Sequence, residues 1–334
     1  MKKTYYLFNP GRLSRNDNTL KFVPRDEDGN EDKPKYLPIE GIDDLYVLGQ
    51  LDANSAMFNF LGQKQVAVHF FDYYENYTGS FMPRENLLSG KMIVQQSLHY
   101  SRPKKRIELA RQFVEGGSFN MLKNLRYYAN RGKELTSHIE TIETYRQQIE
   151  AAETVEELMG IEGNIRQVYY QSFDNILNEL KMEGRSKQPP TNEVNTLISF
   201  GNMICYTQCL RTIHHTQLNP TVSFLHTPGD RRFSLALDIA EIFKPILIDR
   251  VIFKVLNKKE VQAKHFDTQV NGCVLKQAGK KAFIGAIEQR LTETIQHRTL
   301  KRKVSYKHLV KLECYKVAKH ILGMETYQPF KAWW

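Results

Sequence analysis

The sequence predicts an α+β protein in which a small N-terminal β-sheet or sandwich domain precedes a larger all-α domain. Up to about residue 90, short runs rich in Tyr, Val, Phe, Leu and Ile alternate with turn clusters, as is typical of strands. From Lys91 onward, apolar residues recur at helical spacing over long segments. We therefore place a β domain at residues 1–90 and an α-helical domain at residues 91–334.

Within the β domain, turn residues set the strand limits. The expected strands are residues 4–8, 19–23, 36–39, 44–47 and 66–71. One short helix is expected at 54–61. The acidic, Gly-containing run 26–32 is expected to be a hairpin tip or a solvated loop.

In the helical domain the clearest helices are 154–183, 192–217, 233–244 and 276–298. Thr154 with Glu157 three residues later has the pattern of a capping box, in which each side chain bonds the other's backbone N–H. Pro245 marks a point where one helix must end or bend.

Composition narrows the function. Lys and Arg total 47 against 37 Asp and Glu, a net charge of +10 that favours a polyanionic partner such as nucleic acid. No stretch is long and apolar enough for a membrane-spanning helix, and the N-terminus lacks the apolar run of a signal peptide. The four cysteines form no CxxC pair, which fits a reduced compartment. We expect a cytoplasmic protein without membrane contact.

One acidic residue lies where a charge is costly. On a helix, Glu162 shares the apolar stripe of Leu158, Ile165 and Tyr169, which should face the interior. A buried carboxylate needs a partner. A bound metal ion and a buried ion pair, for example to Arg166, both satisfy this need, and the sequence leaves both open.

A second group of chemically active side chains follows between residues 223 and 245. His226 stands between an apolar triplet and a turn, while Asp238, Glu241 and Lys244 recur every three residues on one side of a helix. Surface helices often show the same spacing. Oxygen ligands with one nitrogen suit Mn²⁺ or Mg²⁺ better than zinc.

Basic residues suggest how a nucleic acid would be held. Near the C-terminal end, Arg298 and the run 301–303 (Lys301, Arg302 and Lys303) form a cluster that is expected to bind DNA phosphates. Arg166 beside Tyr169 and Tyr170 is a further DNA-binding candidate, since aromatic rings can stack on exposed bases. The alternative in each case is an ordinary solvated helix face.

Three segments occur in an order that resembles one known family. These are Glu162-Gly-Asn-Ile-Arg166, the run 189–201 beginning Pro-Pro-Thr-Asn, and the block from His226 to Pro245. The opening at residues 11–18 and the stretches from Lys91 and Lys105 are also similar. Over nearly its whole length the chain resembles the CRISPR-associated Cas-one proteins, the integrases of spacer acquisition.

The resemblance implies a site and partners. Glu162, His226 and Glu241 would bind one Mn²⁺ or Mg²⁺ ion, with Asp238 beside them as a further catalytic acid. Lys244 and Asn195 would face DNA. The β domain would serve dimerisation and partner contact. The protein would be a homodimer that binds double-stranded and branched DNA and the small companion protein Cas-two.

The activity implied by the resemblance is phosphoryl transfer. The 3′-hydroxyl of a captured DNA fragment would attack a phosphodiester at the edge of a CRISPR repeat, and the same site would nick branched DNA. Two alternatives remain at this stage. One is a metal-dependent nuclease for branched repair intermediates, and the other is a non-catalytic basic DNA-binding scaffold whose acids are structural.

Overall fold

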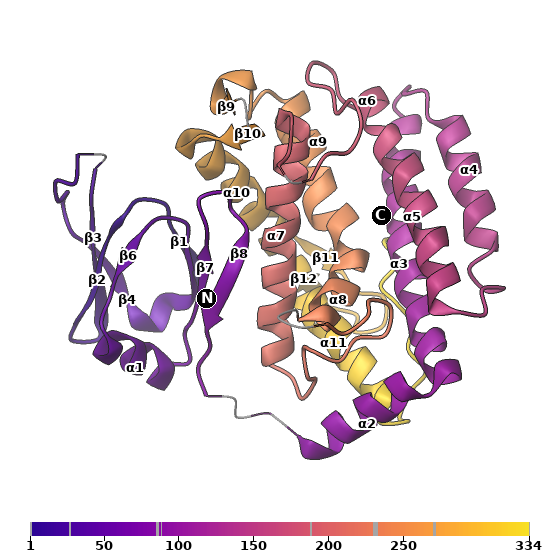
Figure 1. The fold of residues 1–334 in the computed structure, drawn as a ribbon, viewed down its shortest axis with the longest axis horizontal. Helices are drawn as coiled ribbons and strands as arrows, with labels where there is room; N and C mark the ends of the chain where they lie inside the picture. Colours follow the sequence, from indigo (N-terminus) through magenta and orange to yellow (C-terminus); the bar gives the residue numbers. More distant parts are fainter. Residues whose placement is uncertain are drawn as a thin grey trace. The chain divides into compact units, whose positions relative to one another are not determined.

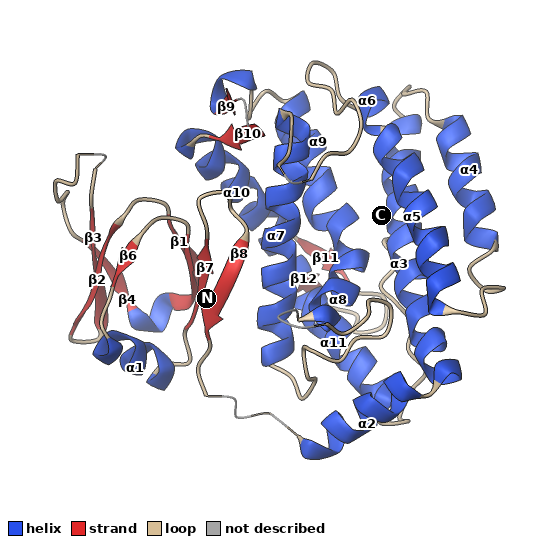
Figure 2. Ribbon diagram, viewed as in Figure 1, coloured by secondary structure: helices blue, strands red, loops and turns tan. Residues whose placement is uncertain are grey.

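The computed structural model describes residues 2–26, 28–84, 87, 89–187, 189–229, 233–269 and 272–333. The chain divides into two compact units, Met1–Asn86 and Leu87–Trp334. The first unit is mainly β and the second mainly helical (Figures 1 and 2). The α+β class predicted from the sequence is therefore confirmed. No helix among these described residues has the length and apolar character that a membrane crossing requires.

The N-terminal unit contains two four-stranded sheets and one helix. The first sheet has the order β1-β5-β7-β8 and the second the order β4-β3-β2-β6. Their bounds are β1 Lys3–Leu7, β2 Gly11–Asn16, β3 Thr19–Pro24, β4 Lys35–Pro38, β5 Ile42–Val47, β6 Leu51–Asp52, β7 Ala67–Phe71 and β8 Tyr77–Phe81. Strands β1, β5 and β7 are parallel, whereas β2, β3 and β4 are antiparallel.

The five predicted strands are confirmed to within two residues, and so is the helix, α1 (Ser55–Gln63). Three further strands, β2, β6 and β8, lacked a signal that the sequence analysis recognised. Strand β2 reads GRLSRN and is mostly polar. It buries Leu13, while Arg12 and Arg15 stay exposed. The tip of the β3–β4 hairpin includes the left-handed Gly29, and Glu27 lies outside the described residues.

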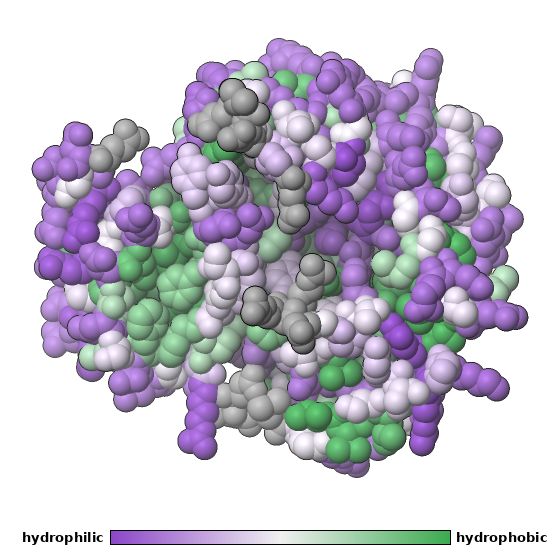
Figure 3. Space-filling model, in the orientation of Figure 1, coloured by the Kyte–Doolittle hydropathy of each residue, from purple (hydrophilic) through white to green (hydrophobic). Residues whose placement is uncertain are grey.

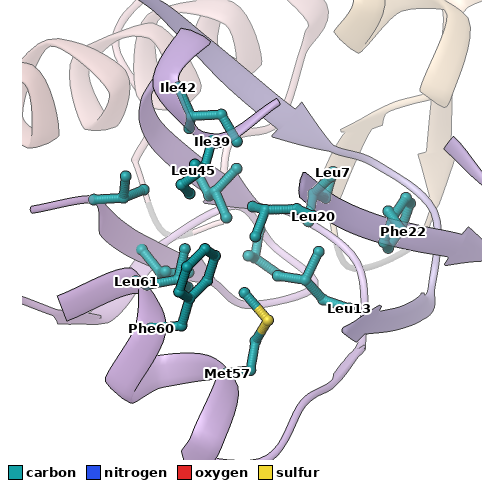
Figure 4. Packing of buried hydrophobic residues seen from close by; sticks show 13 residues of the cluster. Leu7, Leu13, Leu20, Phe22, Ile39, Ile42, Leu45, Met57, Phe60 and Leu61 are labelled. Atoms are coloured by element: carbon teal, nitrogen blue, oxygen red, sulfur yellow. The ribbon is translucent and has the colours of Figure 1, made fainter. Parts of the chain in front are cut away.

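The core of this unit is apolar and lies where both sheets meet α1. Figure 4 shows Met57, Phe60 and Leu61 of α1 close to Leu13 and Leu20 of the second sheet. The first sheet contributes its own buried side chains, so a single cluster joins all three layers. On the face drawn in Figure 3, hydrophobic residues gather over this unit, while hydrophilic residues predominate over much of the helical unit.

The C-terminal unit is a helical assembly with two short hairpins. Its helices are α2 Gly90–Ser101, α3 Pro103–Ala129, α4 Thr136–Gln147, α5 Val155–Gln171, α6 Phe173–Ile176, α7 Glu193–His214, α8 Ser234–Lys244, α9 Arg250–Asn257, α10 Gln277–Thr292 and α11 Tyr306–Ile321. The hairpins pair β9 Phe266–Gln269 with β10 Gly272–Leu275, and β11 Thr294–Gln296 with β12 Lys303–Ser305. The expectation of an all-α domain overlooked these hairpins.

Two predicted helices end six or more residues earlier than expected. The segment 154–183 is helical only through α5 and α6, because the Asp174 carboxylate accepts hydrogen bonds from the backbone N–H groups of Met182 and Glu183 and holds a loop. The segment 276–298 is helical only to Thr292, and β11 begins two residues later at Thr294. The capping box of α5 is confirmed, with Thr154 and Glu157 bonding each other's backbone.

Helix α8 ends at Lys244, directly before Pro245, as the sequence predicted, but helical structure continues beyond the proline. The chain passes from α8 through a π-helical turn, Pro245–Asp249, directly into α9. Asn124 of α3 donates a hydrogen bond to the Pro245 carbonyl at 2.7 Å, and Asn120 donates one to the Ile242 carbonyl at 3.0 Å. Side chains from α3 therefore supply donors to carbonyls beside the irregular turn.

Candidate active site

The predicted acidic residues lie on two helices of the C-terminal unit. Helix α5 carries Glu162 and Arg166 one turn apart, and α8 carries Asp238, Glu241 and Lys244. Helix α3 packs against both. Gly117 of α3 allows this, since a Cβ at that position would lie 3.0 Å from the Glu241 carbonyl oxygen. No pattern in the sequence distinguishes Gly117 from other helical glycines.

Arg166 joins the two glutamates. Its Nε donates to Glu162 Oε1 at 2.6 Å, and its Nη2 contacts both that oxygen and Glu241 Oε2. Because the two carboxylates share one guanidinium nitrogen, their facing oxygens lie within two hydrogen-bond lengths, at most about 6 Å. The ion pair that the sequence allowed for Glu162 is present, and Glu241 extends it.

Glu241 is a largely buried acid surrounded by positive charge. Its side chain is 8% exposed, and Lys244 Nζ donates to its Oε1 at 2.7 Å. Burial alone would raise the pKa of Glu241, but the charges of Arg166, Lys244 and His226 outweigh burial and lower it to about 2. The carboxylate is therefore ionised throughout the physiological range and attracts further positive charge.

Asp238 is fully buried and organises the loop that carries His226. Its carboxylate accepts hydrogen bonds from the backbone N–H groups of Phe224, Leu225 and His226 at 2.7, 3.1 and 3.0 Å. It also accepts one from His226 Nδ1 at 2.8 Å. With its oxygens used in this way, Asp238 positions His226.

The Asp238 contact also defines the chemistry of the imidazole. A proton on Nδ1 leaves the lone pair of Nε2 for another partner, which is the arrangement found in histidine metal ligands backed by a carboxylate. Burial lowers the pKa of His226, but the hydrogen bond and charge of Asp238, with Glu241, raise it overall above its usual value. His226 keeps a quarter of its side chain exposed.

We call Glu162, Arg166, His226, Asp238, Glu241 and Lys244 the carboxylate site. Two carboxylates and one imidazole are suitable donors for Mn²⁺ or Mg²⁺. Within the described part of the chain, however, no three His, Cys, Asp or Glu side chains are arranged as a ready metal cluster. The guanidinium of Arg166 stands between the two glutamates and supplies the positive charge there.

Two predicted DNA-binding residues are turned toward the protein. Asn195 is fully buried, with its Oδ1 accepting from Arg185 at 2.9 Å and its Nδ2 donating to the Gly184 carbonyl at 2.9 Å. It holds the loop before α7 and offers no surface to a ligand. Lys244 is 14% exposed and engaged with Glu241, so its charge belongs to the carboxylate site.

The C-terminal basic cluster is exposed, as a phosphate-binding surface must be. Arg298, Lys301, Arg302 and Lys303 all lie on the β11–β12 hairpin, residues 294–305, which we call the basic hairpin. The chain end packs beside it, since the Trp333 ring contacts His297 and lies under the Arg298 guanidinium at 5.3 Å. Trp334 is outside the described residues.

Comparison with known proteins identifies the family. Residues 5–289 match the family described as CRISPR associated protein Cas1. The chain is 46% identical to the CRISPR-associated endonuclease Cas1 of Fusobacterium nucleatum, over 100% of the chain and 98% of that protein. It is 45% identical to an endonuclease Cas1 of Thermodesulfovibrio yellowstonii, over 99% and 100%.

Solved structures agree. A CAS1 protein from Thermotoga maritima is 38% identical and superposes with a TM-score of 0.87, covering 98% of this chain and 99% of its own. A casposase bound to integration product has the same fold, with a TM-score of 0.88 at 18% identity and coverage of 99% and 93%. The resemblance noted from the sequence motifs is thus confirmed, and the chain belongs to the CRISPR-associated Cas1 family.

Proposed function

We propose that the chain is a metal-dependent DNA endonuclease and integrase of CRISPR adaptation. It would join captured DNA fragments to a repeat array through attack of a 3′-hydroxyl on a phosphodiester. The observation that carries this proposal is the pairing of Glu162 and Glu241 on one guanidinium, next to an imidazole whose Nδ1 is held by Asp238. That arrangement occurs in a chain of the Cas1 family.

Glu162, His226 and Glu241 would hold one Mn²⁺ or Mg²⁺ ion. When bound, such an ion polarises a phosphoryl oxygen and stabilises the charge of the pentacovalent transition state. The residues fit this role because Glu241 is ionised and the Nε2 of His226 keeps its lone pair. Binding requires the Arg166 guanidinium to give up at least one of its two carboxylate contacts.

The remaining residues would act around the scissile phosphate. Asp238 keeps the proton on Nδ1 of His226 and fixes the loop. Arg166, once displaced, and Lys244 carry positive charge beside Glu241 and can offset the negative charge of an approaching phosphodiester. The basic hairpin would bind duplex phosphates further from the reacting atoms, with a strong dependence on salt.

The family and its structural neighbours support the proposed partners. One neighbour of the same fold is a Cas6-RT-Cas1–Cas2 complex, which this chain matches with a TM-score of 0.81 at 17% identity over 36% of that longer chain. We propose that the present chain likewise works as a homodimer with a Cas2 companion on double-stranded and branched DNA.

An integration assay tests the proposal. Purified chain, Cas2, a short duplex with free 3′-hydroxyl ends and a supercoiled plasmid bearing the repeat are mixed with Mn²⁺ or with EDTA. Joining at repeat edges that requires both Mn²⁺ and Glu162 supports an integrase. Cleavage of branched DNA without any joining would support the repair-nuclease alternative instead.

A second function has one observation in its favour. Because Arg166 satisfies both glutamates internally, the acids could be structural and the chain a DNA-binding scaffold. In that case Glu162→Gln would leave all DNA-dependent behaviour intact and would change only the stability of the fold. The same assay, run with this variant, separates the scaffold from the enzyme.

A further inference from the structure

A cavity lined by basic and aromatic side chains lies in the helical unit, among elements other than α5 and α8. It has a volume of about 450 Å³ and is formed by the end of α3, by α9 and by α10. Tyr127 and Tyr128 come from α3, Arg250 begins α9, and Arg290 lies near the end of α10. We call it the arginine pocket.

The arginine pocket carries excess positive charge. Its lining includes five basic side chains, namely Arg131, Arg250, Lys254, Lys258 and Arg290. Glu293 is the one acid among the lining residues that the structure describes, and it already accepts a hydrogen bond from Arg290 Nη1 at 2.5 Å. Lys254 donates to a neutral partner, the Gln289 side chain, at 2.9 Å.

Two positively charged side chains, Arg250 and Arg290, line the pocket and are partly buried. Arg290 has only 14% of its side chain exposed. Burial lowers the pKa of Arg250, and the neighbouring charge of Arg290 lowers it further, partly offset by Tyr128 and Tyr127. Two guanidinium groups held this way repel each other, so an anion entering the cavity would relieve that repulsion.

The aromatic rings of the pocket indicate which class of ligand it can bind. The Tyr127 ring already contacts two guanidinium groups, Arg131 at 4.5 Å and Arg250 at 4.6 Å from its centroid. Arg290 lies over Tyr306 at 3.9 Å. These stacks fix the planes of the arginines and engage the rings that a nucleobase would need. The pocket therefore offers oriented N–H donors, which match phosphate oxygens, in place of an open aromatic face.

We propose that the arginine pocket is a second anion site that binds a phosphate group. The group belongs either to the backbone of a single DNA strand or to a free phosphate compound. Arg250 and Arg290 contact it from the inside of the cavity, and Arg131, Lys254 and Lys258 draw it in. The site works independently of the carboxylate site and requires no metal ion.

Calorimetric titration with inorganic pyrophosphate, at low salt and without divalent metal, tests the proposal. The wild-type chain should bind it at one site. Arg250→Gln should weaken binding by about tenfold or more, because a charge-assisted contact is lost. The matched control Lys264→Gln removes an exposed positive charge outside the pocket and should leave the affinity unchanged.

Two further experiments identify the source of the phosphate group and replace Arg250→Gln if that variant does not fold. A labelled oligothymidylate that binds Arg250→Gln more weakly than the wild type, and is displaced by pyrophosphate, indicates strand phosphates; unchanged binding of the oligonucleotide indicates a free phosphate compound. If Arg250→Gln fails to fold by circular dichroism, the exposed pair Arg131→Gln and Lys258→Gln replaces it and should also weaken pyrophosphate binding.

Other results would overturn the proposal. Absence of pyrophosphate binding, or equal affinity in the wild type and the pocket variants, overturns the proposal. Glu162→Gln should bind pyrophosphate like the wild type. Tighter binding in Glu162→Gln, which removes a negative charge and releases Arg166, would place the anion at the carboxylate site and also overturn the proposal, whereas loss of integration with pyrophosphate binding intact concerns the proposed function alone.

Discussion

The carboxylate site and the basic hairpin use the same kinds of charged side chain in opposite surroundings. In the carboxylate site, Arg166 and Lys244 are largely buried and each contacts an acid. In the basic hairpin, Lys301 and Arg302 are exposed to solvent. Burial strengthens each electrostatic contact, whereas exposure leaves charges screened by salt. We therefore expect substitutions in the first region to affect chemistry and stability, and those in the second to affect DNA affinity.

The largest effect should come from Glu241→Gln. This change removes the negative charge that both Arg166 and Lys244 contact, and it removes a proposed metal ligand. Mn²⁺-dependent nicking and joining should fall by about 100-fold or more. The free energy of unfolding should fall by about 3–5 kcal/mol, because buried cations lose their partner.

Urea denaturation and a plasmid nicking assay measure these two quantities. The control is Glu179→Gln, which removes an exposed acid paired with Lys259 and should change neither. Should Glu241→Gln keep full nicking activity, the carboxylate site would be no more than a structural ion-pair network, and the contrast with the basic hairpin would lose its functional meaning.

Asp238→Asn should have the next largest effect. An amide in place of the carboxylate cannot accept all four hydrogen bonds that now hold the 224–226 loop and the His226 ring. We expect stability to fall by about 2–4 kcal/mol and activity by about 10- to 100-fold. His226→Ala should lose similar activity while staying close to wild-type stability, and equal stability losses in the two variants would refute the positioning role of Asp238.

Asp249 and Glu241, two acids of the helical unit, should change the stability of the fold with pH in opposite directions. Burial raises the pKa of Asp249 to about 7, although its hydrogen bond with Tyr169 and the charges of Arg166 and Lys244 oppose this. Because the folded state binds the proton more tightly, the stability from Asp249 is complete below pH 3.8 and is lost as the pH rises towards about 7. Glu241 acts oppositely, since its contribution is present above pH 4.5 and is lost as the pH falls towards about 2.

Asp249→Asn should therefore flatten the decline in stability between pH 4 and 7, a difference of roughly 2–4 kcal/mol across that range. Denaturation midpoints measured at intervals of pH provide the curve. An unchanged slope in the variant would mean that Asp249 is ionised in the folded protein at neutral pH.

The smallest effect on chemistry should come from the basic hairpin. Replacing Lys301, Arg302 and Lys303 with Gln should weaken duplex binding and reduce the slope of log affinity against log salt by about 1 to 3, as phosphate contacts are lost. Stability and metal-dependent chemistry at saturating DNA should hardly change. Fluorescence anisotropy at several salt concentrations measures the slope, and a slope equal to that of the wild type would remove the hairpin from the DNA-binding surface.

The sequence predicted the class of fold because periodicity and turn residues are local signals. The capping box at Thr154 is such a signal, since both partners lie within one turn. The end of the helical segment predicted at 154–183 was missed because Asp174 of α6 accepts hydrogen bonds from backbone groups eight and nine residues further on. The continuation of helical structure beyond Pro245 was missed for a related reason, since Asn120 and Asn124 act from a distant helix.

Local sequence patterns indicated one part of the carboxylate site and missed another. The apolar stripe around Glu162 correctly pointed to a largely buried carboxylate, whose side chain is 15% exposed, and to Arg166 as its partner. The shared contact of Arg166 with Glu241 joins α5 to α8 across 75 residues, and no local pattern reports such a pairing. Gly117, whose missing side chain lets α3 approach Glu241, was indistinguishable from any other helical glycine.

Calorimetric titration of the metal-free chain with Mn²⁺ measures whether the carboxylate site binds a metal ion. We expect one Mn²⁺ per chain in the wild type, a loss of that binding in Glu162→Gln and Glu241→Gln, and unchanged binding in Glu179→Gln. If the wild type binds no Mn²⁺, or if all four forms bind it equally well, Glu162 and Glu241 are not metal ligands.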